Sequence, residues 1–405
     1  MVKASGGLAD SADGEIIMQT IGNLAAPLLA MLLACYVELL TLKRWRGITI
    51  PWRDTVFNLN SGHVILWVCR GFEVIGYAWV LQHASVHWVN QLPLVAQWLF
   101  GFLAWDFCFY WMHRLHHKFP FLWAIHGIHH EGEHFNLSLG IRNSWYSSLS
   151  NFPFIVGLAV LGLPVEIFVV VSSMHYTVQF YNHNGWVKRS GFLERLMVTP
   201  AYHRVHHGMN AVYVDKNFGG TFQFWDFLFG THQYELPNEP IRYGVTQPTP
   251  SNNPFWVNTL PFLKALGIGH SLQIGRIEDK FPSGWMARAG FVLFLVVVFY
   301  VWIEPAWLLD WMDVSRYWAR WVFVALITAG TIAVGAATDG RRWGMWLWLL
   351  IMAALVWFLI TVIGSNGFEN GRYTGVVFAL SLLLLIHALE CLYLLLIRNL
   401  RKGER

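Results

Sequence analysis

The sequence predicts an all-α fold, a polytopic membrane helix bundle with a histidine-rich helical cap on its cytoplasmic side. Of its 405 residues, 55% are hydrophobic and only 13% are charged, whereas soluble globular proteins have about 25% charged residues. The 23 tryptophans suit a chain with extensive membrane–water boundaries. Of the 18 histidines, 12 lie between His113 and His207, and this concentration requires a chemical explanation.

The net charge and the cysteines exclude other classes of protein. The formal net charge of +4 is spread along the chain and provides no basic surface for nucleic acid. The four cysteines lie far apart in apolar stretches and form no CxxC pair. They therefore predict buried thiols and no disulfide framework.

Apolar stretches of about 20 residues are long enough to cross a bilayer as helices. We expect three such spans before the histidines, at 16–42, 62–82 and 92–112. A shorter apolar pair, 151–163 and 165–182, is broken at Gly162 and Pro164 and predicts a re-entrant hairpin. A polar, histidine-bearing stretch runs from about 184 to 250. Four more spans are expected at 290–309, 319–338, 343–364 and 375–397.

These stretches divide the chain into four predicted regions. They are an N-terminal transmembrane region (1–94), a histidine-box catalytic region with the membrane hairpin (95–250), a linker and interfacial segment (251–288), and a C-terminal four-helix transmembrane region (289–405).

Lysine and arginine in short loops predict which side faces the cytoplasm. Three basic groups fall on one side of the expected bundle if the hairpin returns to its starting side; they are Lys43 to Arg53, Arg341 with Arg342, and Arg398 to Arg405. The opposite loops hold only Arg316 and Arg372, with Arg320 at a boundary. The same count places every histidine cluster at the cytoplasmic face.

The first histidine cluster closes the third expected span. His113 and His117 lie four residues apart and share a helical face, so both can point at one metal ion. His116 is three residues from His113 and is the alternative second ligand. Asp106 and Tyr110 continue the same stripe, and we expect them to orient a histidine from behind.

Two further clusters repeat the HxxHH spacing. They consist of His126, His129 and His130, and of His203, His206 and His207. Thr199 is a natural N-cap for the last cluster, Pro200 suits the first helical position, and Gly208 is a natural stop. The last cluster is therefore expected on a helix of barely two turns, which metal bonds can stabilise.

The outgoing arm of the expected hairpin carries a fourth set of polar residues. His175, Gln179 and His183 lie four apart and share a face, and His183 falls level with the other clusters. Eight or more imidazoles exceed one tetrahedral zinc site, which takes four ligands. The clusters therefore predict two ions in the cap. Imidazole suits zinc, copper, iron and nickel, so the spacing does not name the element.

The motifs resemble the fatty acid hydroxylase and sterol desaturase superfamily of membrane di-iron enzymes, and most closely its alkylglycerol monooxygenase branch with bacterial relatives. The stretches that carry the resemblance are HRLHH at 113–117, NLS at 136–138, TPAYHRVHHG at 199–208, DKNFGG at 215–220 and FWDFLFGT at 224–231. It covers roughly residues 95–250, whereas the last four spans are similar only in hydropathy.

The resemblance implies two iron ions, O2 as cosubstrate and two electrons per turnover. By position it implies the catalytic metal ligands His113, His117, His126, His129, His130, His203, His206 and His207, with His183 as a ninth ligand. Gln179 stands where some relatives have another histidine, and Glu133 matches an acidic position after the second cluster. His116, Asp106, Glu133, His175 and Gln179 are thus additional or supporting candidates.

The electron donor is open at this point. In the alkylglycerol monooxygenase branch a glutamate tied to tetrahydropterin follows the HxxxH motif, whereas this chain has Lys118 there. This departure weighs against a tetrahydropterin, and a ferredoxin or a cytochrome is an alternative external donor.

We therefore expect a multi-pass membrane monooxygenase, with its active site facing the cytoplasm, that hydroxylates an ether lipid, a fatty acyl chain or a related lipid. Hydroxylation of an ether lipid can lead to ether cleavage. One alternative keeps the di-iron site but desaturates or hydroxylates a sterol, carotenoid or hopanoid. A divalent-metal transporter is the non-enzyme alternative, but such sites usually lie near the midplane with carboxylates. The sequence does not predict the oligomeric state.

Overall fold

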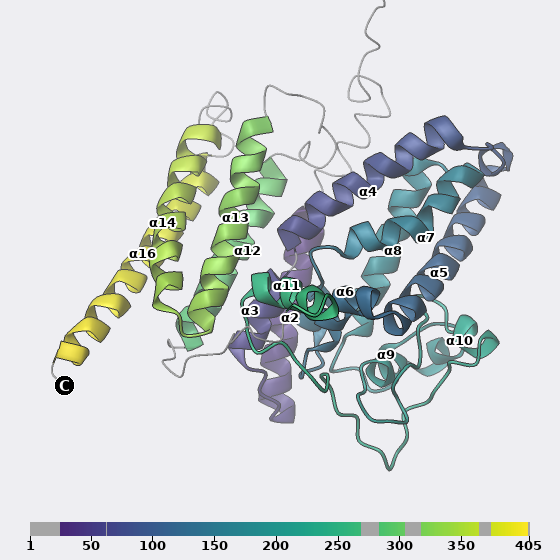
Figure 1. Ribbon diagram of the computed structural model, residues 1–405, viewed down its shortest axis with the longest axis horizontal. Helices are drawn as coiled ribbons and strands as arrows, with labels where there is room; N and C mark the ends of the chain where they lie inside the picture. The colour runs from purple at the N-terminus through teal and green to yellow at the C-terminus, as the bar shows by residue number, and fades with distance from the viewer. Residues whose placement is uncertain (1–24, 62, 269–282, 304–316, 364–373, 404–405) are drawn as a thin grey trace, which may run out of the picture. The chain divides into compact units, whose positions relative to one another are not determined.

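The computed structural model describes residues 25–61, 63–268, 283–303, 317–363 and 374–403 (Figure 1). Within these ranges the chain is helical, and its single β-type contact is an isolated bridge between Met197 and Phe222. The all-α prediction is therefore confirmed. The expected residues before 25, at 304–309 and at 364, and the loop arginines Arg316 and Arg372, lie outside the described residues.

The chain divides into two compact units. Unit 2 comprises residues 34–250 and 256–273, and unit 1 comprises residues 1–33, 251–255 and 274–405. Every predicted histidine ligand belongs to unit 2. The finer division into four regions stays a prediction.

The helices of unit 2 follow the expected order. They are α2 (Ala25–Arg46, from residue 34), α3 (Trp52–Asn60), α4 (His63–Ala84), α5 (Leu94–Lys118), α6 (Pro120–His130), α7 (Ser147–Leu161), α8 (Val165–Asn182), α9 (Pro200–His206), α10 (Phe224–Leu228) and α11 (Pro254–Ala265, from residue 256). Short 3₁₀ turns are η2 (Val89–Gln91), η3 (Leu137–Ile141) and η4 (Gly191–Arg195). Helices α4, α5, α7 and α8 lie side by side, and α6 and α9 lie at the histidine-bearing end of α5 (Figure 1).

The hairpin between α7 and α8 turns where the sequence predicts. Gly162 ends α7 with φ +92°, a left-handed conformation that costs glycine little. A Cβ at Gly162 would also lie 2.9 Å from the Cα of His87. Pro164 then precedes the first turn of α8, so the chain reverses within a few residues.

The core of this unit lies between α4, α5, α7 and α8. The rings of Tyr77 and Phe168 stack with centroids 3.9 Å apart, and the hydroxyl of Tyr77 donates to the carbonyl of Leu163 at 2.9 Å. Arg70 and Glu73 on α4 form an ion pair. Pairing reduces the cost of burying both charges, so these two residues have a structural partner in each other.

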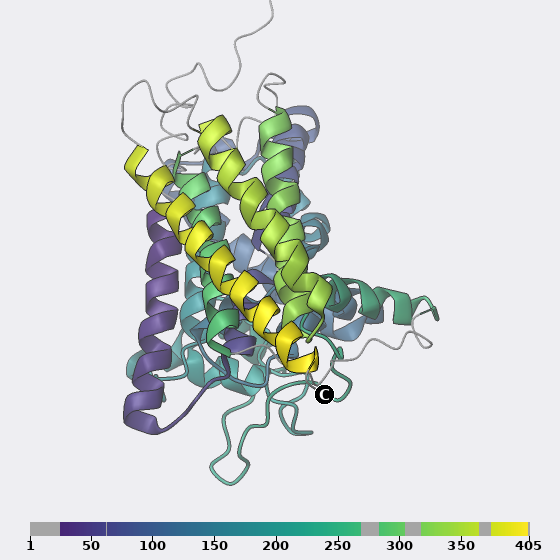
Figure 2. The same ribbon diagram turned by 90° about the vertical axis from the view of Figure 1, so that its left-hand side faces the viewer.

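Unit 1 is built from apolar helices. They are α12 (Ser283–Ile303), α13 (Tyr317–Thr338), α14 (Arg342–Phe358), which continues into a π-helical turn at Leu359–Ile363, and α16 (Thr374–Gly403). Figure 2 shows α13, α14 and α16 running alongside one another. Among the described residues, three segments are long and apolar enough to cross a membrane: Trp318–Thr338, Arg342–Thr361 and Thr374–Leu396.

These three segments coincide with the expected spans 319–338, 343–364 and 375–397, which indicates a membrane protein. Helices α4 and α5 cover the expected spans 62–82 and 92–112, and α12 covers most of 290–309. Of these, only part of α12 (Gly284–Tyr300) appears among the shorter apolar helices. The full number of crossings and the cytoplasmic orientation therefore stay predictions.

A buried carboxylate ties α2 to the loops around the histidines. Glu38 is 5% exposed and accepts the backbone N–H groups of Leu137 at 2.6 Å and of Gly185 at 2.7 Å. Leu137 begins η3, and Gly185 follows α8. Both loops therefore depend on one side chain.

We predict that Glu38→Gln lowers the free energy of unfolding by about 2 kcal/mol, because one charge-assisted hydrogen bond to a buried N–H group is lost. Thermal unfolding of the purified protein in detergent measures the effect. Glu166→Gln, an exposed position on α8, is the matched control, and equal stability of the two variants would contradict the assignment.

Candidate metal centre

The histidines of unit 2 gather into two groups. The five-histidine group consists of His113, His117, His126, His130 and His206, and the four-histidine group consists of His129, His183, His203 and His207. In each group one ligand atom per residue lies within 4.8 Å of all the others. The two groups are adjacent, since the rings of His130 and His207 stack at 4.5 Å. The structure therefore brings together all nine predicted ligands.

Within the groups, the Nε2 atoms face one another. Nε2 of His126 lies 3.0 Å from Nε2 of both His113 and His130. Nε2 of His183 lies 2.9 Å from Nε2 of His203 and 3.1 Å from that of His129. Two nitrogens bound to one ion at about 2.1 Å would be roughly 3.0 to 3.4 Å apart, so these separations suit shared ligation.

Backbone carbonyls hold the other nitrogen of several rings. Nδ1 of His113 donates to the carbonyl of Phe218 at 2.9 Å, and Nδ1 of His206 donates to that of Lys216 at 2.9 Å. Because a carbonyl only accepts, Nδ1 carries the proton and Nε2 keeps the lone pair. Nδ1 of His117 instead lies 3.4 Å from the carboxylate of Asp215.

Two rings of the four-histidine group are oriented in the same way. Nδ1 of His129 donates to the carbonyl of Arg142 at 2.8 Å, and Nδ1 of His183 donates to that of Gln179 at 2.7 Å. Gln179, one helical turn before His183, therefore supports the site through its backbone carbonyl.

The clustered rings are held in the neutral form. Burial, followed by repulsion from the neighbouring imidazoles, lowers the pKa of His126, His130 and His207 well below the ordinary value. Burial lowers the pKa of His129 to about 4 and also lowers that of His117, where Asp215 partly opposes it. Neutral imidazole is the form that binds a metal ion.

Unused nitrogens test whether a metal fits. Nε2 of His117 and Nε2 of His206 are buried and make no hydrogen bond in the described structure, although the Nδ1 atoms of both rings have partners. A buried polar atom without a partner is costly. A cation between the rings would satisfy both lone pairs, so the donor set of the five-histidine group fits a metal ion. In the four-histidine group, the converging Nε2 atoms of His129, His183 and His203 offer a similar set of donors.

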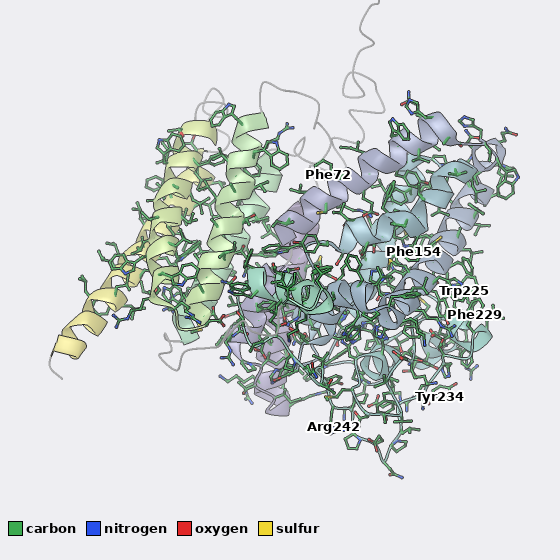
Figure 3. All side chains as sticks on the ribbon, viewed as in Figure 1. Phe72, Phe154, Trp225, Phe229, Tyr234 and Arg242 are labelled. Atoms are coloured by element: carbon green, nitrogen blue, oxygen red, sulfur yellow. The ribbon has the colours of Figure 1, made fainter. Side chains whose placement is uncertain are left out.

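His116 lies apart from both groups. Its Nδ1 donates to the carbonyl of Met112 at 2.7 Å and its Nε2 lies 3.0 Å from the hydroxyl of Ser150, while its ring lies 6.2 Å from that of Phe154 (Figure 3). Both of its nitrogens therefore have protein partners. Of the two alternatives in the first cluster, His117 is the one that faces the other ligands.

The remaining candidates also lie outside the two groups. Asp106 accepts the backbone N–H of Thr221 at 2.7 Å and the indole N–H of Trp225 at 3.0 Å, and its nearest histidine is His175, at 3.5 Å. The side chain of Gln179 donates to the carbonyl of Gly220. Glu133 is exposed. Gln179 thus holds the last residue of the DKNFGG motif, and Asp106 and His175 hold the segment that follows it.

The loop at 215–220 supplies the supporting contacts that sequence reasoning missed. It provides the carbonyls that orient His113 and His206, and its own backbone is fixed by Asp226, which accepts the N–H groups of Phe218 and Gly219 at 2.7 Å. A Cβ at Gly220 would lie 2.0 Å from Cε1 of His175, so only glycine permits this approach. The motifs DKNFGG and FWDFLFGT indicate that this region matters. The contacts themselves are made by backbone carbonyls, which every residue has, so the sequence does not predict them.

A second buried network supports the four-histidine group. Arg142, whose carbonyl holds His129, donates through Nε to the carbonyl of Ile128 at 2.6 Å and pairs with Glu131 at 3.2 Å. Glu131 in turn accepts the N–H of Thr249 at 2.9 Å. The end of α6 is thus tied to a loop more than a hundred residues later.

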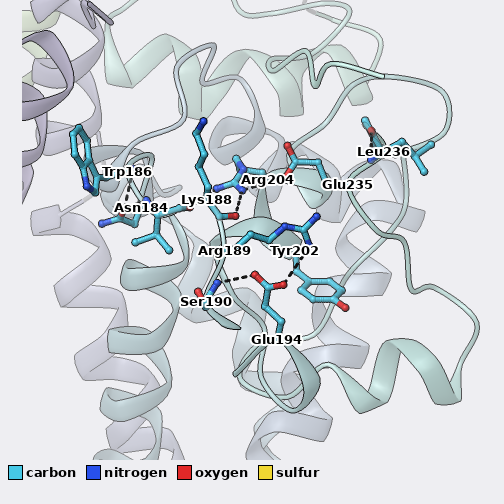
Figure 4. Close-up of polar contacts among 12 residues, drawn as sticks. Asn184, Trp186, Lys188, Arg189, Ser190, Glu194, Tyr202, Arg204, Glu235 and Leu236 are labelled. Atoms are coloured by element: carbon cyan, nitrogen blue, oxygen red, sulfur yellow. Dashed lines mark hydrogen bonds and ion pairs between the residues drawn. The ribbon is translucent and has the colours of Figure 1, made fainter. Parts of the chain in front are cut away.

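An arginine on α9 holds the loop that precedes this helix. Arg204 donates to the carbonyls of Val187 and Lys188 at 2.7 and 2.8 Å and pairs with Glu235 at 3.1 Å (Figure 4). Thr199 occupies the N-cap position of α9 and Pro200 the first helical position, as expected, but the Thr199 side chain makes no capping hydrogen bond. The helix ends at His206 with His207 as the C-cap, so Gly208 follows the helix end as predicted.

We predict that Asp226→Asn destabilises the protein by about 2 kcal/mol, because an amide cannot accept from both N–H groups of the loop and from the Thr231 hydroxyl. Thermal unfolding in detergent measures the loss, with Glu166→Gln at an exposed position on α8 as the control. A loss no greater than that of the control would show that the loop does not depend on Asp226.

Comparison with known proteins agrees with the motifs. Residues 98–231 match the family model described as fatty acid hydroxylase. Alkylglycerol monooxygenase of Xenopus tropicalis is 31% identical over 226 residues, which cover 55% of this chain and 49% of the relative. The human alkylglycerol monooxygenase is 34% identical over 190 residues, covering 46% and 41%.

A bacterial relative is the ornithine lipid hydroxylase of Rhizobium tropici, 27% identical over 176 residues that cover 41% of this chain and 50% of the relative. The chain thus spans about half or less of the length of these relatives. No solved structure matches it. The matches confirm the resemblance: the histidine-bearing residues 98–231 of this chain are similar to the fatty acid hydroxylase family and to these lipid-hydroxylating relatives.

Proposed function

We propose that this chain is a multi-pass membrane di-iron monooxygenase that uses O2 and a reductant to hydroxylate a C–H bond of a lipid. The observation that carries the proposal is the pair of adjacent groups of five and four neutral imidazoles within a helical unit rich in apolar side chains. The names of the relatives, alkylglycerol monooxygenase and ornithine lipid hydroxylase, support a lipid substrate and an oxygenation.

The nine histidines of the two groups are the proposed metal ligands. Imidazole suits several transition metals, and the choice of iron rests on the family. Bound iron would supply the activation of O2 and the oxidation of the C–H bond. Five nitrogen ligands in one group also exceed the four of a structural zinc site.

The protein's own contribution is orientation and the exclusion of water. The carbonyls of Phe218, Lys216 and Arg142 fix the ring tautomers, which keeps each Nε2 lone pair directed at its group. The ligand rings are buried or half-buried, and exclusion of water limits side reactions of an oxidising centre.

The substrate that we propose is an ether lipid, a fatty acyl chain or a related lipid, and hydroxylation beside an ether oxygen would lead to ether cleavage. Such molecules can approach from the bilayer, while the reductant approaches from the cytoplasm. The electron donor is an external protein or small molecule. Lys118 is exposed at the end of α5, where the alkylglycerol monooxygenase branch has its pterin-linked glutamate, so we favour a donor other than tetrahydropterin.

We predict about two irons per chain in the purified protein, and a loss of O2-dependent lipid turnover of at least about 100-fold in His129→Ala. Metal analysis and mass spectrometry of lipid products measure these effects. His83→Ala, an exposed position away from both groups, is the control and should retain activity. Full activity of the His129 variant, or of protein free of metal, would refute the proposal.

Removal of metal tests the element. Chelation should abolish turnover, and Fe²⁺ added under reducing conditions should restore it, whereas Zn²⁺ should occupy the groups without restoring activity because zinc has no redox chemistry. Restoration by Zn²⁺ would exclude a redox oxygenase.

The mass of the product distinguishes the reactions within the superfamily. We expect the gain of one oxygen atom, labelled when ¹⁸O2 is supplied. Loss of two hydrogens without incorporation of oxygen would instead indicate a desaturase of a sterol, carotenoid or related lipid.

A further inference from the structure

Helix α10 places its polar residue inward and its apolar residues outward. Phe224, Phe227 and Leu228 share one helical face and are 41%, 52% and 67% exposed. Asp226 on the same short helix is buried and bonded to the 215–220 loop. Water favours the opposite arrangement, so the outer face of α10 does not suit an aqueous surface.

The 3₁₀ turn η4 shows the same inversion. Phe192, Leu193 and, just after the turn, Leu196 are 67%, 46% and 55% exposed. The carboxylate of Glu194 between them turns inward, where it accepts the backbone N–H of Ser190 at 2.8 Å (Figure 4).

Backbone contacts join these two segments. The N–H of Gln223, just before α10, donates to the carbonyl of Leu196 at 3.3 Å, and Met197 forms a bridge with Phe222. The segments thus present one outer apolar surface, which consists of Phe192, Leu193, Leu196, Phe224, Phe227 and Leu228. An exposed apolar patch of this kind marks an interaction site.

The outer apolar surface continues an exposed stripe along α5. Val95, Leu99, Leu103 and Phe107 lie four residues apart on one face of α5 and are 71%, 61%, 47% and 39% exposed. The ring of Phe107 lies 5.0 Å from that of Trp225, a residue of α10 that Figure 3 labels. A stripe of this length on a 25-residue helix suits lipid chains.

Two arginines lie at the edge of the outer apolar surface. The guanidinium carbon of Arg195 lies 5.9 Å from the centroid of the Phe192 ring, and the side chain of Arg189 is 67% exposed. Nη1 of Arg189 forms an ion pair with the carboxylate of Glu194 at 3.3 Å, but that carboxylate is only 16% exposed, so most of the exposed charge of this pair belongs to the arginine. Exposed cations beside exposed aromatic side chains match the phosphate level of a bilayer.

We propose that the outer apolar surface inserts into the interfacial layer of a bilayer, with Arg189 and Arg195 binding the phosphates of anionic lipids. The continuation along α5 favours lipid over a second copy of the chain or a soluble partner, because a local protein contact does not require the apolar face to extend along α5 from Phe107 to Val95. This inference concerns lipid binding and does not depend on the proposed oxygenation.

A depth measurement tests the insertion. Nitroxide labels are attached to Phe192→Cys, to Leu228→Cys and to the control Asn238→Cys, an exposed polar loop position, in the full chain in lipid nanodiscs. The native cysteines are buried or half-buried, and the unmutated protein reports their background labelling. We expect collisions with O2 to exceed those with a water-soluble nickel chelate at 192 and 228, and the reverse at 238.

Two results of the depth measurement overturn the proposal. Labels at 192 and 228 that collide mainly with the nickel chelate would place the surface in water. Labels shielded from both reagents would show that protein covers it, either a second copy or a partner.

The lipid phosphate is tested separately. The double variant Arg189→Gln with Arg195→Gln should lower the preference for phosphatidylglycerol over phosphatidylcholine in retained lipid by about fivefold or more. Arg242→Gln, at another exposed arginine, should leave the preference unchanged. Equal preference in both variants would overturn the role of the two arginines. If the label depths are as expected but the unmutated protein turns over no lipid, only the proposed oxygenation is contradicted.

Discussion

Hydrogen bonds from Nδ1 to backbone carbonyls fix which nitrogen faces the centre of the group in four of the grouped histidines, two in each group. Without them, either tautomer of a buried imidazole is available, and crowded rings would exchange protons with one another. With Nδ1 of His113, His206 and His129 committed to carbonyls, the Nε2 lone pairs converge instead. Neutral nitrogens packed this closely attract a cation strongly. Among the described residues, both groups consist of histidines alone, so imidazole nitrogens are the ligands that each group offers.

Those carbonyls depend on loops that would not hold their shape alone. The 215–220 loop contains left-handed conformations at Asp215 and Asn217 and is fixed by the carboxylate of Asp226 from another segment. The loop that carries Arg142 is fixed by its own guanidinium and by Glu131. Rigid supporting contacts of this kind are what a metal site requires, since small displacements of a ligand weaken binding.

The need to hold these loops explains where polar and apolar side chains lie in unit 2. Charged side chains such as Glu38, Asp106 and Asp226 are buried because each accepts N–H groups of a histidine-supporting loop, and apolar side chains cover much of the outside. A protein in water would lose stability from such an exchange. Next to lipid the same exchange places hydrocarbon against hydrocarbon and keeps the polar contacts dry.

The sequence alone determined the helical class, the three apolar spans of unit 1 and the turn at Gly162, because these depend on local composition, and it grouped the histidines of each cluster by helical spacing. The full set of converging ligands came from the resemblance of the motifs to the superfamily. It left His116 and His117 as alternatives and assigned Asp106 to a supporting role at a histidine ligand. Only the tertiary structure decided these points, since they depend on which ring nitrogen meets a carbonyl or hydroxyl from a distant segment. The contributions of Phe218, Lys216 and Arg142 to the site are made by their backbone carbonyls, which every residue has, so no residue type in the sequence could have revealed them.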